Sequence, residues 1–248
     1  MSIAGAALFA RFAIAPNVLG YCGPPEHEAL RAIAGGDLVD ADAARQIAQG
    51  FEGAWPYLEL LAGAAGCADP LDERIVEAYW LGNELLARVQ HTEWGWHLHD
   101  RFAGRNRSGA RAVLETVGDG GLANHAFHVF EVYPWMGMLR EGRGGDEPLR
   151  IMDRCRIRPG VVTAVSSGLV RVLCRPLEWD GVRLMLGAAR PEEAILSTVE
   201  VTVGDVVALH WDWVCQVLAP RQAGWLDRVT MQQLALVERH HTLLRTGY

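Results

Sequence analysis

Apolar residues recur every three to four positions through most of residues 1–148, which is the period of helices that bury one face. The segment 69–89, DPLDERIVEAYWLGNELLARV, shows this pattern most clearly. Asp69 or Asp72 can cap its first turn, and the acidic residues near its start complement the helix dipole. The pattern predicts a helical domain over residues 1–148.

The pattern changes after the polar, Gly-rich segment 141–148 (EGRGGDEP). Short β-branched runs split by Gly, Ser and Asp follow over residues 155–186, and the same alternation returns over residues 196–218. We therefore predict a small antiparallel, OB-like β-barrel over residues 149–218. Residues 219–248 have the pattern of an amphipathic helix that packs back onto the rest of the chain. The predicted fold class is α+β.

Composition limits the classes of partner. Of the 248 residues, 50% are hydrophobic and 21% are charged, which is enough apolar surface for a substantial core. The net charge of −7 argues against the basic face of a nucleic-acid or anionic-membrane binder, so we expect neither partner. The basic residues are all Arg, which excludes Schiff-base chemistry from Lys. Apolar faces on the long helices predict a homodimer.

The number and spacing of the cysteines indicate a reducing cellular compartment. They are Cys22, Cys67, Cys155, Cys174 and Cys215, and they include no CxxC pair. An odd, scattered set is typical of free thiols in a reducing environment, so we expect a cytoplasmic protein. The apolar N-terminal stretch is interrupted by Arg11 and no basic segment precedes it, which predicts neither a signal peptide nor a membrane anchor.

Residues 91–102, HTEWGWHLHDRF, gather many chemically active side chains. On a helix, Glu93 and His97 are four residues apart and meet. The stretch has no HExxH motif, so a metal site here is less favoured than acid–base chemistry. His125 and His128, in the later segment HAFHVF, are either additional metal ligands or packed core histidines.

Acid–base chemistry on an aromatic substrate fits this stretch better than a metal site does. The residues expected to line a flat pocket are Tyr79, Trp80, Trp94, Trp96 and His97. Burial in such a pocket would raise the pKa of Glu93 and make it a proton-transfer group near neutral pH. Arg74 could bind a substrate carboxylate through two parallel hydrogen bonds. Alternatively, Arg74 pairs with Asp72 or Glu77 on the surface and the tryptophans only pack in the core.

The helical part resembles the bacterial β-carboline-forming Pictet–Spenglerases of actinomycete alkaloid pathways, through an Arg, a His and an acidic residue in the same order. The resemblance assigns catalysis to Arg74, His91 and either Glu93 or Asp100, with no cofactor. It implies condensation of a tryptophan-like amino acid with an aldehyde, after which a base restores the aromatic indole. The chain contains neither GxGxxG nor GxxxxGK[ST], so nucleotide use has no support from these motifs.

The C-terminal third resembles the small OB-like chaperones of [NiFe]-hydrogenase maturation. The matching segments are CRIRPGVVTAV, which begins with Cys155, and VGDVVALHWDWV, which contains His210. In those chaperones a cysteine at the start of the chain is the functional thiol and a histidine follows the VGD-type strand. The resemblance implies an alternative function, a maturation accessory protein that works through Cys155 and His210. Here, however, Cys155 lies in the middle of the chain.

The whole chain is similar to a set of actinobacterial proteins that share the segments FARFA, LGYCG, EAYW, GNELL, DRCRIR and LHWDWVC. The similarity spans nearly the full length. It implies one two-part architecture and carries no settled activity.

Overall fold

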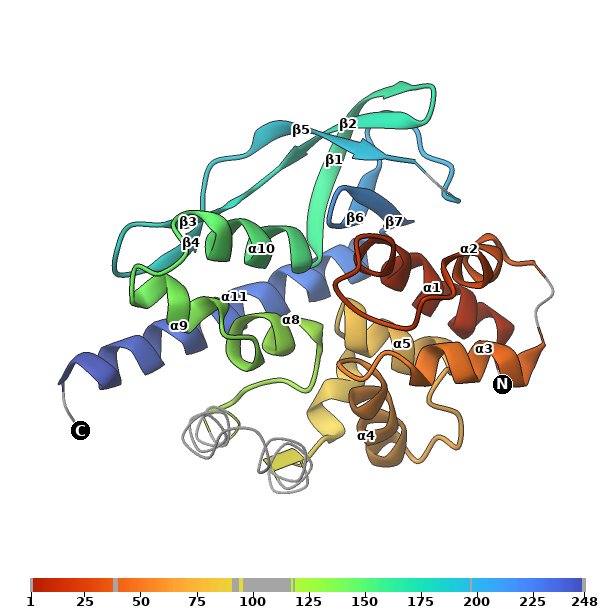
Figure 1. The fold of residues 1–248 in the computed structure, drawn as a ribbon, viewed down its shortest axis with the longest axis horizontal. Helices are drawn as coiled ribbons and strands as arrows, with labels where there is room; N and C mark the ends of the chain where they lie inside the picture. The colour runs from red at the N-terminus through yellow and green to blue at the C-terminus, as the bar shows by residue number, and fades with distance from the viewer. Residues whose placement is uncertain are drawn as a thin grey trace.

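A computed structural model describes residues 2–37, 40–90, 94–95, 117, 119–196 and 198–246. Helices of the N-terminal half pack beside a closed five-stranded barrel, a two-stranded sheet and a long C-terminal helix (Figure 1). The α+β prediction is therefore confirmed. No helix among the described residues combines the length and hydropathy needed to cross a membrane.

The N-terminal part consists of α1 (Ile3–Val18), α2 (His27–Gly35), α3 (Ala41–Gln49), α4 (Trp55–Ala65), α5 (Glu73–Trp80) and the 3-10 helix η1 (Glu84–Arg88). Helix α1 is the centre of this part, since α2, α3 and α5 all contact it. Most of its side chains are apolar and buried, so it has no polar face of the usual amphipathic kind. The hydroxyl of Ser2 caps it by accepting a hydrogen bond from the Gly5 amide.

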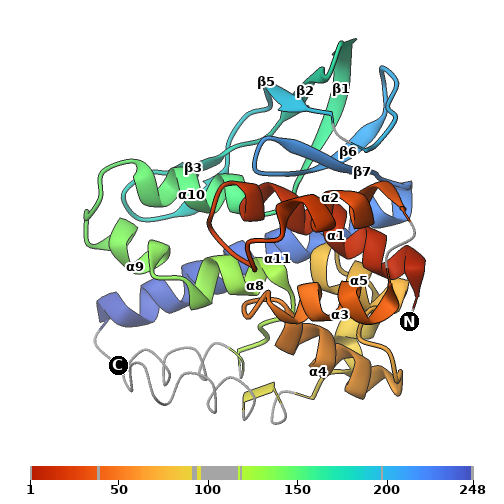
Figure 2. The ribbon, with the colours of Figure 1, turned by 45° about the vertical axis from the view of Figure 1, so that its right-hand side comes forward.

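A second set of helices packs against both this part and the β-structure. It consists of α8 (His125–Phe127), the π-helical turn η2 (His128–Val132), α9 (Trp135–Arg140), α10 (Glu147–Cys155) and α11 (Pro220–Thr246). The terminal helix α11 contacts both α8 and η2. It runs along the molecule beneath the barrel in both views (Figures 1 and 2).

The barrel follows α10 directly. Its strands are β1 (Arg158–Ser166), β2 (Leu169–Cys174), β5 (Arg190–Ile195), β6 (Val206–His210) and β7 (Trp213–Val217), and β3 (Leu177–Trp179) and β4 (Leu184–Leu186) form a separate hairpin. The closed order is β1-β2-β5-β7-β6. Neighbouring strands are antiparallel except β5 and β7, which meet in parallel at Ile195 and Trp213. Valine and leucine side chains that alternate along the strands fill the interior.

The helix expected over residues 69–89 is interrupted. Helix α5 begins after Asp72, whose carboxylate accepts a hydrogen bond from the Arg74 amide, and it ends at Trp80. Gly82 then has a φ of 89°, a left-handed conformation that ends helices and that glycine adopts without a steric penalty. The chain resumes as η1, which Asn83 caps.

A buried ion pair joins α10 to the hairpin. The Asp153 carboxylate accepts hydrogen bonds from Nε and Nη2 of Arg156, at 3.1 and 2.8 Å, and from the Leu177 amide at 2.9 Å. Arg156 also donates to the carbonyl of Arg175. The Arg156 side chain is only 2% exposed, so Asp153 compensates a charge that has almost no water around it.

The Asp153→Ala substitution is expected to destabilise the fold by about 3–5 kcal/mol, because it leaves the Arg156 guanidinium buried without its counter-ion. The matched control on the same helix is Glu147→Ala. It breaks the pair between Glu147 and Arg150, which is exposed and screened by solvent, so its loss should be much smaller. Urea unfolding followed by circular dichroism measures both losses. Equal losses in the two variants would contradict this account.

Candidate metal centre

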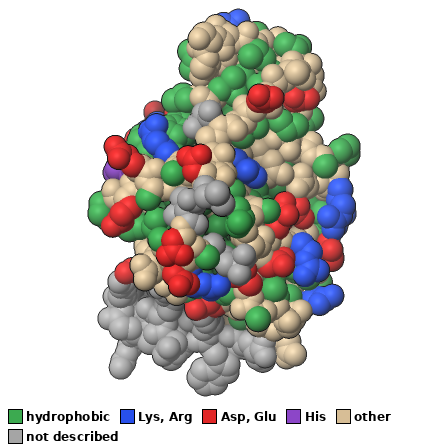
Figure 3. Space-filling model, turned by 90° about the vertical axis from the view of Figure 1, so that its right-hand side faces the viewer, with side chains coloured by type: hydrophobic (Ala, Val, Ile, Leu, Met, Phe, Trp, Pro, Cys, Tyr) green, Lys and Arg blue, Asp and Glu red, His purple; other side chains and the backbone are tan. Residues whose placement is uncertain are grey.

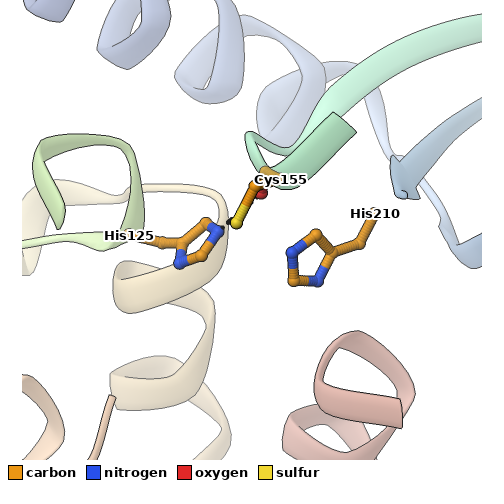
Figure 4. Close-up of side chains that lie close together, drawn as sticks. All are labelled: His125, Cys155 and His210. Carbon is orange, nitrogen blue, oxygen red and sulfur yellow. Dashed lines mark hydrogen bonds between the residues drawn. The ribbon is translucent and has the colours of Figure 1, made fainter. Parts of the chain in front are cut away.

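Three buried side chains from three elements converge where the helices meet the barrel. They are His125 at the start of α8, Cys155 at the end of α10 and His210 at the end of β6. Figure 4 shows them pointing toward one another. One ligand atom of each lies within 4.8 Å of the other two. A thiolate and two imidazoles are ligands typical of zinc, iron and related transition metals.

Strand pairing explains how two of the three residues meet. Cys155 lies three residues before β1, and His210 is the last residue of β6. These strands pair antiparallel, with Arg158 opposite Leu209, so the start of one and the end of the other lie at the same end of the barrel. Trp211, directly after His210, has a positive φ of 54°, and its amide donates to the Arg154 carbonyl at 2.7 Å.

His210 has the hydrogen-bond arrangement of a metal ligand. Its Nδ1 is 2.6 Å from the main-chain carbonyl of Phe12, which can only accept, so Nδ1 carries the proton. Its Nε2 is buried and makes no hydrogen bond within the described residues. Ligating histidines commonly donate one N–H to a carbonyl in this way, which fixes the ring and leaves the other nitrogen for the metal.

His125 is held on both sides of its ring. Nε2 lies 2.8 Å from the carbonyl of Cys155 and therefore donates to it, and Nδ1 lies 3.4 Å from the hydroxyl of Tyr79. Burial lowers the pKa of His125 to about 4, with the Cys155 carbonyl partly opposing the shift. Burial also lowers the pKa of His210 well below its ordinary value, and the neighbouring His125 adds to this effect. Both rings are therefore neutral at pH 7, which is the form that binds metal.

The thiol of Cys155 is not an activated nucleophile. Burial raises its pKa well above the ordinary value, so it is protonated at neutral pH in the absence of a metal. A bound divalent cation would reverse this preference, since a coordinating thiol loses its proton. The arrangement fits metal binding better than thiol catalysis.

Aromatic rings enclose the cluster. The Trp80 ring centroid lies 4.7 Å from that of His125 and 5.5 Å from that of His210, and Trp80 stacks on Phe12 at 5.4 Å. Tyr79, which precedes Trp80 on α5, also contacts His125, at 5.7 Å between ring centroids. Such packing excludes water and strengthens electrostatic interactions at the cluster.

The structure places the residues predicted for an aromatic pocket in different surroundings. Tyr79 and Trp80 are buried beside His125, and Trp94 is buried against Phe127 at 4.4 Å between centroids. The Arg74 side chain is 73% exposed and pairs with Asp72 at 3.2 Å, which is the surface alternative. The remaining predicted residues, His91, Glu93, Trp96, His97 and Asp100, lie outside the described residues.

The two histidines of HAFHVF have different surroundings. His125 joins Cys155 and His210, whereas Nδ1 of His128 lies 3.3 Å from the hydroxyl of Tyr57, away from the cluster. The sequence offered both as ligands or as core residues without linking either to Cys155. Asn124, whose side chain accepts from the Phe127 amide, caps the short helix that carries His125.

The fold and the cluster define a two-part α+β protein in which helices and a small barrel share a buried Cys/His site. The chain belongs to a family of unknown function, DUF6390, whose model matches residues 1–243. Searches of curated proteins and of solved structures found no match.

We expect the metal-free protein to lose stability as the pH falls from about 6.5 toward 4. In this range His125 takes up a proton in the unfolded chain, where its pKa is the ordinary 6.5. The buried ring of the folded protein, with a pKa of about 4, stays neutral. The unfolded state therefore binds more protons, and the folded state loses up to about 3 kcal/mol from this group. Denaturant unfolding at a series of pH values measures the slope. His125→Asn should flatten it, and an unchanged slope would contradict the assignment.

Proposed function

We propose that the protein is a metal-handling accessory protein of the hydrogenase-maturation type, with Cys155 and His210 as ligands for iron. The observation that carries the proposal is the cluster itself, in which the ligand atoms of these residues and of His125 lie within 4.8 Å of one another. The barrel supports it, since Cys155 precedes the first strand and His210 ends a strand paired with it. These positions agree with the resemblance to the maturation chaperones.

The chemistry of the donors suits a transition metal, and iron is one of these. Imidazole and thiolate together suit iron, zinc and cobalt better than magnesium or calcium, which prefer oxygen ligands. Binding replaces the thiol proton of Cys155, which is released to solvent, and leaves both imidazoles neutral. Fe²⁺ with one thiolate keeps a net positive charge, so the site would also accept anionic ligands that the iron carries.

The Pictet–Spengler condensation stays a prediction. His91, Glu93 and Asp100, on which it depends, lie outside the described residues, and Arg74 is paired at the surface. Calorimetry with tryptophan separates the two functions. Saturable binding that Arg74→Ala abolishes would favour the condensing enzyme.

We expect the full-length protein, prepared without metal and under anaerobic conditions, to bind about one Fe²⁺ per chain. Cys155→Ala and His210→Ala should each weaken binding by more than about 100-fold, because loss of a partner outside the ligands alone costs about 10–100-fold. Equilibrium dialysis with iron analysis measures both the stoichiometry and the affinity.

The matched control is Cys174→Ala, which removes another buried thiol, on β2 inside the barrel. Its iron binding should equal that of the wild type. Equal binding by Cys155→Ala and Cys174→Ala would rule out the proposed site.

A further inference from the structure

We propose that His125 is a third metal ligand, supplied by the helical part of the chain, and that Tyr79 is the residue that positions it. The inference rests on the proposed metal function and extends it. Cys155 and His210 alone give a two-ligand site at one end of the barrel. With His125 the chain supplies three ligands, and a tetrahedral ion keeps one position for a further ligand.

The two histidines share one feature, a hydrogen-bond partner for Nδ1 on an N-terminal helix. Nδ1 of His210 donates to the Phe12 carbonyl on α1, which leaves Nε2 on the cluster side. In His125, Nε2 instead donates to the Cys155 carbonyl, and Nδ1 faces the Tyr79 hydroxyl on α5. Each ring therefore has a partner for Nδ1 within the N-terminal helices, which is the arrangement that orients ligating histidines.

The Tyr79 hydroxyl is suited to accept a hydrogen bond from a protonated Nδ1 of His125. Its hydroxyl lies 3.4 Å from the Gly53 carbonyl as well as 3.4 Å from His125 Nδ1. The hydroxyl can donate its hydrogen to Gly53 and accept from Nδ1 with its lone pairs.

Metal binding then exchanges one neutral tautomer of His125 for the other. Without metal, Nε2 carries the proton and donates to the Cys155 carbonyl at 2.8 Å. With metal, Nε2 offers its lone pair to the ion and the proton resides on Nδ1, hydrogen-bonded to Tyr79. The ring gains and loses one proton and stays neutral throughout.

The molecule contains a matched pair for comparison. Tyr57 and His128 repeat the contact, with 3.3 Å between the hydroxyl and Nδ1 and 5.6 Å between ring centroids. His128 is buried, as His125 is, but it does not belong to the cluster. Substitutions in this second pair report the cost of disturbing a buried Tyr–His contact without touching the proposed ligands.

The test is an anaerobic Co²⁺ titration of the full-length protein, because cobalt absorption reports both thiolate bonding and the number and type of ligands. We expect His125→Ala to keep the thiolate-to-cobalt charge-transfer band. Its affinity should fall more than about tenfold and its ligand-field bands should shift, since water replaces an imidazole. His128→Ala should match the wild type in affinity and spectrum.

Tyr79→Phe removes only the hydroxyl and keeps the buried ring, so it tests the same arrangement if His125→Ala does not fold. We expect it to weaken cobalt binding about tenfold and to alter the ligand-field bands, whereas Tyr57→Phe should change neither. A spectrum and affinity that are the same for Tyr79→Phe and Tyr57→Phe would overturn the positioning role.

The outcomes separate this inference from the proposed function. Cobalt binding that requires Cys155 and His210 but is unchanged in His125→Ala overturns the third ligand alone. Absence of cobalt binding by the wild type, or a charge-transfer band that persists in Cys155→Ala, overturns the metal function and the third ligand together.

Discussion

The hydrogen bond between His210 and the Phe12 carbonyl is the contact on which the site depends. It joins residues 198 positions apart, at 2.6 Å, and ties the end of β6 to the central helix α1. Burial removes the hydration of the imidazole, and without this partner no hydrogen bond would compensate that loss. The barrel therefore cannot shift against α1 without a large cost, and Trp80 fills the space beside the bond by contacting Phe12 and both cluster histidines.

Charged and neutral side chains are buried side by side where the helices meet the barrel. Arg156 keeps its charge because Asp153 lies against it, and Arg158, fully buried on β1, pairs with Glu192. The cluster next to them contains only neutral groups, because burial lowers the histidine pKa values and raises that of Cys155. The face on the right-hand side of Figure 1, by contrast, carries acidic and basic side chains interspersed among hydrophobic ones (Figure 3).

The sequence predicted the fold better than the site. Alternating β-branched runs after residue 148 identified the barrel, because strand periodicity survives in a small, half-exposed sheet. The parallel contact of β5 with β7 was missed, since periodicity does not say which strands close a barrel. The continuous helix expected over residues 69–89 was wrong because Gly82 adopts a left-handed conformation that single glycines within helices do not always adopt.

For the site, resemblance paired Cys155 with His210, but no local pattern could add His125. Its closeness to Cys155 arises from packing between α8 and the end of α10, which are separated by 30 residues along the chain. Arg74 illustrates the opposite difficulty. A helical Arg next to acidic residues fits both a surface pair and a carboxylate anchor, and the three-dimensional structure shows that it is exposed.

The position of Cys155 as the last residue of α10 sets the electrostatic character of its surroundings. Peptide dipoles along a helix add up to a partial negative charge of about half an elementary charge at its C-terminal end. The field of the helix end therefore disfavours a free thiolate at Cys155 and attracts a cation. The helix that precedes the barrel thus does more than connect it, because its C-terminal end favours a cation beside this thiol.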